Sequence, residues 1–556
     1  MQCIKYSLKQ LFIFLFLTII LSVININGLE TKQPPHIIFI LADDLGFNDV
    51  GFHGSSQIPT PNIDILAYSG IILNNYYVSP ICTPSRSALM TGKHPIHLGT
   101  QHGVLYGAEP RGLSLSEAIM PEFFQKLGYK NRIVGKWHLG SWKLVYTPTF
   151  RGFDSHLGFW TGHLDYNDHT AMEKGTWGLD MRNGTKIAYN LHGEYITSAI
   201  TKECVKIIEN HNENDPLFLY IPHAAVHSGN PYNPLAAPDE TVAELNHILD
   251  YNRRRFAAMM VELDKSVGEV ITSLSKKNML QNSIIIFSTD NGGPAAGFNL
   301  NAASNFPLKG VKNTLWEGGV RGAGFLWSPL LNKTQRVSQQ MMHITDWLPT
   351  LITAAGGDRS LFTSDIADLK LDGKDLWKAL SENKPSPRNE ILHNIDDVEG
   401  NSALTLGEWK IIKGSTYKGQ WDNWYGPSGR SDVYNVSKVL TSKSAVALEK
   451  IGKIPSHNEI LNLRNEATVT CSNEKRVECS PLIQDCLFNI KNDPCETINL
   501  AEKFPSVLKD LQKRISDWNT TAVPPGNLPV DPRGDPKYFE YVWTNFGDHE
   551  YQVLTS

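Results

Sequence analysis

The sequence has few cysteines, no marked excess of one charge and only one long apolar run. Its 556 residues include seven cysteines, and the formal net charge is -5. A nucleic-acid-binding surface needs a strong basic surplus, so this weak acidic bias argues against nucleic acid as a partner. Beyond residue 28, no segment is long and apolar enough to cross a membrane, and no repeats or low-complexity tracts occur. These absences leave a globular chain that is long enough for two or more domains.

The long apolar run lies at the N-terminus. Lys5 and Lys9 precede the apolar residues 11–24, and the small residue Gly28 follows. Because this run is shorter than the roughly 20 residues that span a bilayer, it predicts a cleaved signal peptide over residues 1–28 rather than an anchor. The mature chain would enter the secretory pathway without stable membrane insertion, and its destination would be the lysosome or the extracellular space.

The cysteines and the sequons fit that pathway, which is oxidising. Four cysteines cluster near the C-terminus, and among their possible pairings we expect Cys471 with Cys479 and Cys486 with Cys495. A zinc site is the weaker interpretation because no CxxC spacing occurs. With a signal peptide present, the N-x-S/T sequons predict glycosylation at four surface sites: Asn183, Asn332, Asn435 and Asn519.

Four short apolar runs predict a mostly parallel sheet. They cover residues 36–42, 132–135, 216–222 and 283–289, and helical patterns at 114–128 and 251–277 lie between them. Continuous β-branched and aromatic runs are typical of parallel strands buried on both faces, and the alternation with helices indicates an α/β fold. Ligand sites in such sheets lie beyond the carboxyl ends of the strands. Each run is followed there by polar residues: Asp43 and Asp44, Lys136 and His138, His223 and His227, and Asp290 and Asn291.

The sequence changes character after about residue 390. Residues 389–396 and 403–414 read as short strands of a second sheet, residues 414–440 as a long loop, and residues around 502–518 as a helix. We therefore expect a catalytic domain over residues 29–388 and a smaller C-terminal domain over residues 389–556, with a short antiparallel sheet and a helix.

The stretch SPICTPSRSALMTGK at 79–93 places a lone cysteine beside a predicted helix start. Thr83 suits the N-cap, Pro84 the first helical position, and Gly92 can end the helix. A helix N-terminus together with Arg86 favours a bound anion next to Cys82. Taken alone, the pattern is also explained by a structural or redox cysteine whose pKa is lowered by the helix end.

The residues Cys-Thr-Pro-Ser-Arg followed by Thr-Gly resemble the signature of the sulfatase family. Further segments resemble the family in the same order along nearly the whole mature chain, and the likeness is strongest to the arylsulfatase B (N-acetylgalactosamine-4-sulfatase) group. The resemblance implies an alkaline-phosphatase-like sandwich and the hydrolysis of sulfate esters. The matching segments are residues 35–54, 58–70, 128–140, 288–293, 306–329, 391–396 and 486–501.

The resemblance also implies a modified nucleophile and a metal ion. Cys82 would be oxidised by the formylglycine-generating enzyme to Cα-formylglycine, whose hydrate carries two hydroxyls on one carbon. One hydroxyl attacks sulfur to form a covalent sulfo-enzyme, and deprotonation of the other releases sulfate. One Ca²⁺ would be bound by oxygen ligands, which suit Ca²⁺ or Mg²⁺ rather than zinc. Its expected ligands are Asp43, Asp44, Asp290, Asn291 and the modified residue 82.

Cations and histidines would complete the site. By resemblance, Lys136 and Lys312 bind the sulfate, and Arg86 orients the formylglycine hydrate. His138 would deprotonate the second hydroxyl. His227 is the candidate that binds sulfate and protonates the leaving oxygen, and for its nearby rival His223 we favour a structural role.

The substrate is less defined than the chemistry. The resemblance suggests sulfated sugars of the N-acetylgalactosamine 4-sulfate type, and aryl sulfates are a second class. A phosphate- or phosphonate-ester hydrolase on the same fold, and a non-catalytic binder of sulfated glycans, are the rival functions. We expect the rim of the cleft, residues 160–190, 228–240 and 414–432, to decide the specificity.

Overall fold

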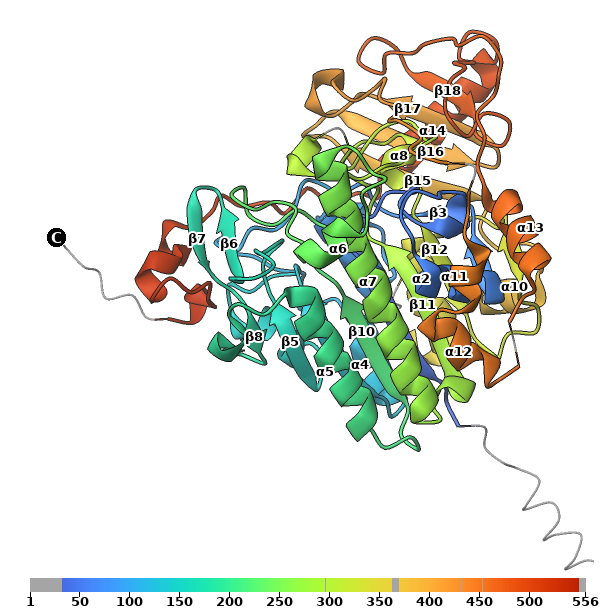
Figure 1. The fold of residues 1–556 in the computed structure, drawn as a ribbon. Helices are drawn as coiled ribbons and strands as arrows, with labels where there is room; N and C mark the ends of the chain where they lie inside the picture. Colours follow the sequence, from blue (N-terminus) through green and yellow to red (C-terminus); the bar gives the residue numbers. More distant parts are fainter. Residues whose placement is uncertain (1–32, 296, 363–369, 432, 453, 550–556) are drawn as a thin grey trace, which may run out of the picture. The chain divides into compact units, whose positions relative to one another are not determined.

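A ten-stranded mixed sheet forms the centre of the computed structural model, which describes residues 33–549 apart from 296, 363–369, 432 and 453 (Figure 1). The predicted signal peptide, residues 1–28, lies outside the described residues. In spatial order the strands are β13 (Arg336–Ser338), β2 (Ile71–Leu73), β12 (Gly324–Trp327), β11 (Ser283–Thr289), β1 (His36–Ala42), β10 (Leu217–Pro222), β4 (Lys130–Lys136), β5 (Ser155–Phe159), β8 (Arg182–Asn183) and β9 (Lys186–Ile187).

The five adjacent strands β11, β1, β10, β4 and β5 are parallel, and they include all four predicted runs. In β1, Ile38 and Ile40 face one core, and Ile37 and Phe39 face the other. All four of these side chains are buried, because helices cover both faces of the sheet. The continuous apolar runs are therefore explained by burial on two sides, and the predicted α/β class is confirmed.

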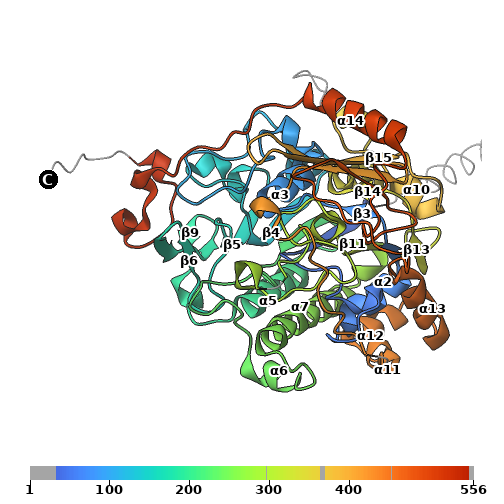
Figure 2. The ribbon, with the colours of Figure 1, turned by 90° about the horizontal axis from the view of Figure 1, so that it is seen from above.

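Two groups of helices cover the sheet (Figures 1 and 2). One group packs in the core that contains Ile38, and the other in the core that contains Ile37. The first comprises α2 (Pro61–Ser69), α5 (Ile196–Asn210), α7 (Tyr251–Lys276), α11 (Val436–Leu440), α12 (Lys443–Glu449) and α13 (His457–Ala467); the second comprises α3 (Cys82–Thr91), α4 (Met120–Lys126), α9 (Trp347–Ala354) and α10 (Trp377–Glu382).

The helix expected over 251–277 coincides with α7, but the one expected over 114–128 is shorter. It is α4, which begins at Met120 and has Pro121 in its first turn. Proline is tolerated there and breaks a helix interior, so the longer helix was wrong at its start. Among the described residues, no helix has both the length and the apolar character needed to cross a membrane.

A second, antiparallel sheet follows in the C-terminal part. It contains β15 (Glu390–Asp396), β16 (Asn401–Leu406), β17 (Trp409–Lys413) and β18 (Cys486–Asn489). One face packs on Tyr77 and Trp316 of the larger part of the chain. The other face packs against α14 (Pro505–Asn519), which lies beside β15 in Figure 2. The expected small sheet and helix are confirmed, while the domain boundary at residues 388 and 389 stays a prediction.

A buried ion cluster ties this sheet to the rest of the chain. The ammonium of Lys410, on β17, lies 2.8 Å from a carboxylate oxygen of Glu317, in α8 (Glu317–Val320), and 2.8 Å from one of Glu496. All three side chains are fully buried. The amide of Glu317 also donates a hydrogen bond to Glu496, so each group of the cluster has a partner.

Replacing Lys410 with methionine is expected to lower the free energy of unfolding by about 3–5 kcal/mol. The variant leaves two buried carboxylates without their shared cation, and chemical denaturation measures the loss. Lys202→Met is the matched control, because that lysine pairs with Glu194 on the surface, where ion pairs contribute little. Equal, small losses in both variants would show that the buried cluster does not stabilise the fold.

The disulfide pairing differs from the expectation. Among the described residues two disulfides form, but Cys471 pairs with Cys495 and Cys479 pairs with Cys486. The cause is the path of the chain, because Val477 hydrogen-bonds to Thr497 and Asn499 and so lays residues 471–479 alongside the segment after β18. The Cys479–Cys486 disulfide therefore lies inside the loop that the Cys471–Cys495 disulfide closes.

All four predicted glycosylation sites are exposed. The asparagines of the four sequons lie at turns, strand ends or helix ends, and each is accessible to a glycan. Attachment of glycans at Asn183, Asn332, Asn435 and Asn519 stays a prediction.

Candidate active site

The carboxyl ends of the parallel strands bring most candidate residues to one edge of the sheet. Asp43 and Asp44 follow β1, Asp290 and Asn291 follow β11, and Lys136 is the last residue of β4. The register of β1 with β11 sets Ala42 beside Thr289, so the two polar pairs are neighbours. The amide of Asp44 donates a hydrogen bond of 3.2 Å to Asp290.

Cys82 faces this acidic group from the first residue of α3. Its Sγ lies 3.8 Å from Oδ1 of Asp43, and the side chain is buried. The helix begins at Cys82, two residues earlier than expected, and the hydroxyl of Thr83 does not cap it. That hydroxyl instead accepts from the amide of Leu105 and donates to the carbonyl of His138. The end is as expected, since Gly92 takes a left-handed conformation with φ 65°.

Oxygen atoms and residue 82 form a group that fits a metal ion. Ligand atoms of Asp43, Cys82 and Asp290 lie within 4.8 Å of one another, as do those of Asp44, Cys82 and His227. Nδ2 of Asn291 donates a hydrogen bond of 2.8 Å to Oδ1 of Asp44, while the buried Oδ1 of Asn291 has no hydrogen-bond partner. A buried carbonyl without a donor is costly unless it binds something, so it suits a hard cation.

Three cations balance the three carboxylates. Nζ of Lys136 lies 2.6 Å from Oδ2 of Asp43, and Nζ of Lys312 lies 2.6 Å from Oδ1 of Asp44. The guanidinium of Arg86 donates to Asp290 at 2.8 and 3.1 Å. All three cationic side chains are almost wholly removed from solvent, so their fields act at low effective dielectric.

Burial sets the protonation of the central groups. It raises the pKa of the Cys82 thiol to about 12, so the unmodified side chain stays neutral at pH 7. This is the opposite of the lowered pKa that a helix end alone would produce.

The two carboxylates beside it shift in opposite directions. Burial and the neighbouring Asp43 raise the pKa of Asp290, although the guanidinium of Arg86 acts to lower it. For Asp44, burial raises the pKa, but Lys312 and His227 outweigh it and the net shift is downward.

His138 presents one ring nitrogen as a base. Its Nε2 lies 2.9 Å from the carbonyl oxygen of Leu105, which can only accept, so Nε2 carries the proton. The other nitrogen, Nδ1, is buried and has no partner. Burial, Lys136 and Arg86 hold the pKa of His138 well below its usual range, so the ring is neutral.

The two histidines after β10 lie in different surroundings. Nε2 of His227 lies 3.5 Å from Oδ2 of Asp44, and Nδ1 of the same ring donates a hydrogen bond of 2.6 Å to the carbonyl oxygen of Ser228. His223 lies instead within 3.4 Å of the hydroxyl of Ser266 on α7. Burial lowers the pKa of both rings to about 3. The geometry therefore brings His227, and not His223, to the acidic group.

A cavity of about 410 Å³ opens onto these residues. Cys82, His138, His227 and Lys312 line it. Its walls include parts of all three expected rim segments, and residues 104–106 and 298–300 as well. A larger cavity elsewhere contains none of the candidate residues, so size alone would have selected the wrong place.

Two further residues of this cavity lie within the expected rim segment 160–190, but no motif in the sequence singles them out. Glu173 ends β6 (Thr170–Glu173), and its carboxylate accepts from the amides of Gly107 and Gly162. Burial raises the pKa of Glu173 to about 7. His163 stacks on His227 with ring centroids 5.7 Å apart. Neither follows one of the predicted strands, and the three-dimensional path of residues 160–174 brings them here.

Comparison with known proteins identifies the family. The Sulfatase family profile matches residues 35–357, more than half of the chain. Arylsulfatase J of Mus musculus is 40% identical over 525 residues, which cover 93% of this chain and 81% of that protein. N-acetylgalactosamine-6-sulfatase of Homo sapiens is 29% identical over 441 residues, which cover 76% of this chain and 79% of that protein.

Solved structures have the same fold. The chain matches Ps i-CgsB in complex with k-i-k-neocarrahexaose with a TM-score of 0.67 and 25% identity, over 90% of this chain and 96% of that one. The PsFucS1 sulfatase from Pseudoalteromonas sp. matches with a TM-score of 0.64 and 23% identity, over 92% of this chain and 95% of that one.

The family resemblance expected from the sequence is thus confirmed, while the narrower likeness to the arylsulfatase B group stays a prediction. The named relatives are arylsulfatases and sulfatases, which are sulfuric ester hydrolases. The family profile, the relatives and the fold agree, and the chain belongs to the sulfatase family.

Proposed function

We propose that the chain hydrolyses sulfate esters with residue 82 in its formylglycine form and one Ca²⁺ beside it. The observation that carries the proposal is the position of Cys82, at the first residue of α3, 3.8 Å from Asp43 and in the wall of the cavity. As a hydrate, the modified residue would supply one hydroxyl that attacks sulfur and a second whose deprotonation releases sulfate.

The proposed metal ligands are oxygen atoms of Asp43, Asp44, Asp290 and Asn291, together with residue 82. Their fit rests on the grouping of the ligand atoms and on the unpartnered Oδ1 of Asn291. A bound Ca²⁺ would lower the pKa of a hydroxyl and neutralise charge on a sulfate oxygen.

Lys136 and Lys312 are proposed to bind the sulfonyl oxygens. Both ammonium groups already point at the acidic residues, and Lys312 also lines the cavity. Fixed charges in a site that excludes water stabilise a transition state by several kcal/mol, since they need no reorganisation. Arg86, which is buried and held by Asp290, is proposed to orient residue 82.

The two histidines are proposed to move protons in opposite directions. His138 has a bare, neutral Nδ1, so it can accept a proton from the second hydroxyl. His227 must carry a proton to give one to the leaving oxygen. Burial lowers the pKa of His227 to about 3 in the absence of substrate, and the negative charge of a sulfate ester would raise it.

A sulfated sugar of the N-acetylgalactosamine type is the proposed substrate, with aryl sulfates as the second class. Phe298 and Tyr417 line the cavity and pack edge to face, 5.2 Å apart, which gives an apolar side for a sugar or aryl ring. One relative is named for N-acetylgalactosamine 6-sulfate chemistry, and one solved neighbour contains an oligosaccharide.

The rival hydrolase is tested with the sulfate and the phosphate monoesters of one nitrophenol. We expect the sulfate ester to have the higher kcat/KM, because the proposed site sets two lysines beside a single metal ion. Faster turnover of the phosphate ester would overturn the proposal. A protein with confirmed formylglycine and calcium that turned over neither ester nor any sulfated sugar would instead be a binder of sulfated glycans.

Glu173→Gln is expected to lower kcat by about 10-fold with little change in KM. The carboxylate holds the loops of Gly107 and Gly162, and Gly162 packs against the His138 ring. A glutamine can accept only one of the two amide hydrogen bonds, so the ring loses its fixed position. Steady-state kinetics measure the effect, and Glu194→Gln is the surface control. A change confined to KM would contradict the positioning role.

The proposal also covers how the chain matures and where it is located. The chain would meet the formylglycine-generating enzyme in the secretory pathway, lose residues 1–28 and reach the lysosome or the outside of the cell. We also propose the division into a catalytic domain over 29–388 and a C-terminal domain over 389–556.

A further inference from the structure

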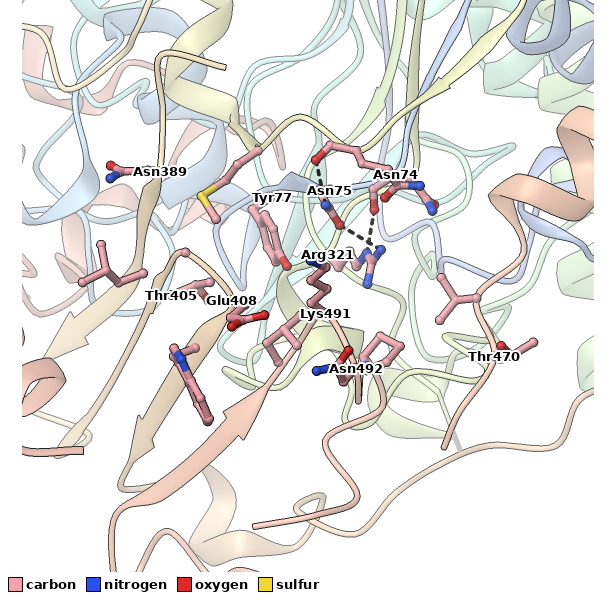
Figure 3. Close-up of a pocket in the computed structure, with 18 of the residues that line it drawn as sticks. Asn74, Asn75, Tyr77, Arg321, Asn389, Thr405, Glu408, Thr470, Lys491 and Asn492 are labelled. Carbon is pink, nitrogen blue, oxygen red and sulfur yellow. Dashed lines mark hydrogen bonds between the residues drawn. The ribbon is translucent and has the colours of Figure 1, made fainter. Parts of the chain in front are cut away.

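The cavity at Cys82 adjoins a second, smaller one of about 230 Å³. Tyr106, Glu173 and Lys174 line both cavities, and the C-terminal residues 530–543 form much of the remaining wall of the smaller one. The larger cavity between the two sheets, which Figure 3 shows, shares no lining residue with either of them. A ligand at Cys82 that is longer than one sugar can therefore extend toward the C-terminal segment.

The C-terminal segment is fixed against the hairpin of β6 and β7 (Thr176–Leu179), beside which it lies in Figure 1. The amide of Leu179 donates to the carbonyl of Tyr541, and the amide of Trp543 donates to the carbonyl of Leu179. The indole of Trp543 donates a hydrogen bond of 3.0 Å to the carbonyl of Ala171, on β6. Backbone hydrogen bonds thus hold two walls of the smaller cavity together.

A tight turn places Lys174 at the junction of the two cavities. Glu173 pairs with Thr176, so Lys174 and Gly175 alone connect β6 to β7. Both have left-handed backbones, with φ of 49° and 86°, as in the type I′ turn that suits the twist of a hairpin. Glycine, asparagine and aspartate tolerate this conformation better than lysine does. The turn by itself therefore does not explain a lysine at this position.

The charge of Lys174 is not compensated by the protein. The side chain is exposed, and it forms no ion pair with any residue that the structure describes. Its ammonium lies 4.5 Å from the centroid of the Tyr106 ring, a contact that leaves N–H donors for another partner. Lys312 and Lys537, which also line these cavities, each lie within 3.0 Å of a carboxylate oxygen.

We propose that the substrate continues from the sulfated sugar at Cys82 past Tyr106 into the smaller cavity, where Lys174 binds an anionic group on the next sugar. That group is a carboxylate or a second sulfate. The inference rests on the proposed function, which places the sulfated sugar at Cys82. It makes Lys174 a specificity-determining residue that favours anionic oligosaccharides over single sulfate esters. Because the lysine is exposed, its effect is modest and falls with salt.

The test compares a disaccharide of sulfated N-acetylgalactosamine and glucuronic acid with the methyl ester of its carboxylate, in both linkage orders. We expect kcat/KM to be about fivefold higher for the acid than for the ester in the parent, mainly through KM, and the ratio to approach one in about 0.5 M salt. The ratio compares two substrates in one protein, so a general loss of activity cancels.

Two variants of Lys174 remove or reverse its charge. Lys174→Gln should bring the ratio to about one, and Lys174→Asp should invert it. The aspartate variant should melt no lower than the parent, because Asp-Gly suits the turn. Asparagine is avoided, since it would create a glycosylation sequon with Gly175 and Thr176. Lys186→Gln is the matched control: this lysine is exposed and lines neither cavity, so its variant should keep the parent ratio.

A third disaccharide, with a sulfate in place of the carboxylate, identifies the group, and preference for either anion over the ester supports the proposal. Calorimetric binding of the same probes to Cys82→Ala protein measures the preference without turnover. Turnover with no preference for either anion, or a preference that survives Lys174→Gln, overturns the role of Lys174 alone. A protein that hydrolyses no sulfate ester, yet binds the anionic probes more tightly through Lys174, would overturn the proposed function and leave this inference standing.

Discussion

Replacing Cys82 with alanine is expected to lower kcat for sulfate esters by at least about 10⁴-fold, with the fold intact. Alanine keeps Cβ but lacks the sulfur, so this carbon cannot be converted to the aldehyde whose hydrate would bear the attacking hydroxyl, and no other described nucleophile lies in the same position. Loss of a covalent nucleophile usually removes most of an enzyme's rate enhancement. Steady-state kinetics measure the loss, and circular dichroism with thermal melting checks the fold.

Cys204→Ala is the matched control for this experiment. Cys204 is the other free cysteine among the described residues, and it is buried on α5 in the apolar core. Its variant should retain the parent kcat, since it lies outside the cavity at Cys82. Near-normal turnover by Cys82→Ala, or an equal loss in both variants, would contradict the proposed role of residue 82.

Replacing Asp290 with alanine is expected to weaken calcium binding by more than about 100-fold and to lower kcat/KM by at least about 10³-fold. The carboxylate is a proposed metal ligand, and it also holds Arg86 through two hydrogen bonds. Calcium titration of chelator-treated protein measures the affinity directly, so the result does not depend on activity.

A second variant and a control separate metal binding from stability. Asn291→Ala removes the unpartnered Oδ1 but leaves Arg86 paired, so it should also lose calcium affinity. Asp264→Asn alters an equally buried carboxylate that accepts hydrogen bonds from α2, and it should lower the melting temperature while leaving calcium affinity unchanged. Unchanged calcium stoichiometry and affinity in both site variants would refute the ligand set.

The buried strands were the most predictable part of the fold. The runs at 36–42 and 283–289 coincide with β1 and β11, because a strand buried on both faces is apolar at every position. Parallel strands end at one edge, and so Asp43, Asp44 and Asp290 could be expected together before any geometry was known.

Features that depend on contacts between distant segments could not be predicted. The hydroxyl of Thr83 bonds to residues 105 and 138 instead of capping α3, which no local pattern reveals. The disulfides are nested because residues 471–479 run beside residues 495–499. Glu173 reaches the site through the β6 hairpin, which no local pattern places beside Cys82.

Mass spectrometry of the peptide that contains residue 82, from protein purified out of its own secretory pathway, tests the central claim most directly. The account predicts an aldehyde at this position that reacts with a hydrazide probe, while Cys204 in the same sample keeps its thiol. A stoichiometric free thiol at residue 82 in protein that hydrolyses sulfate esters would contradict it.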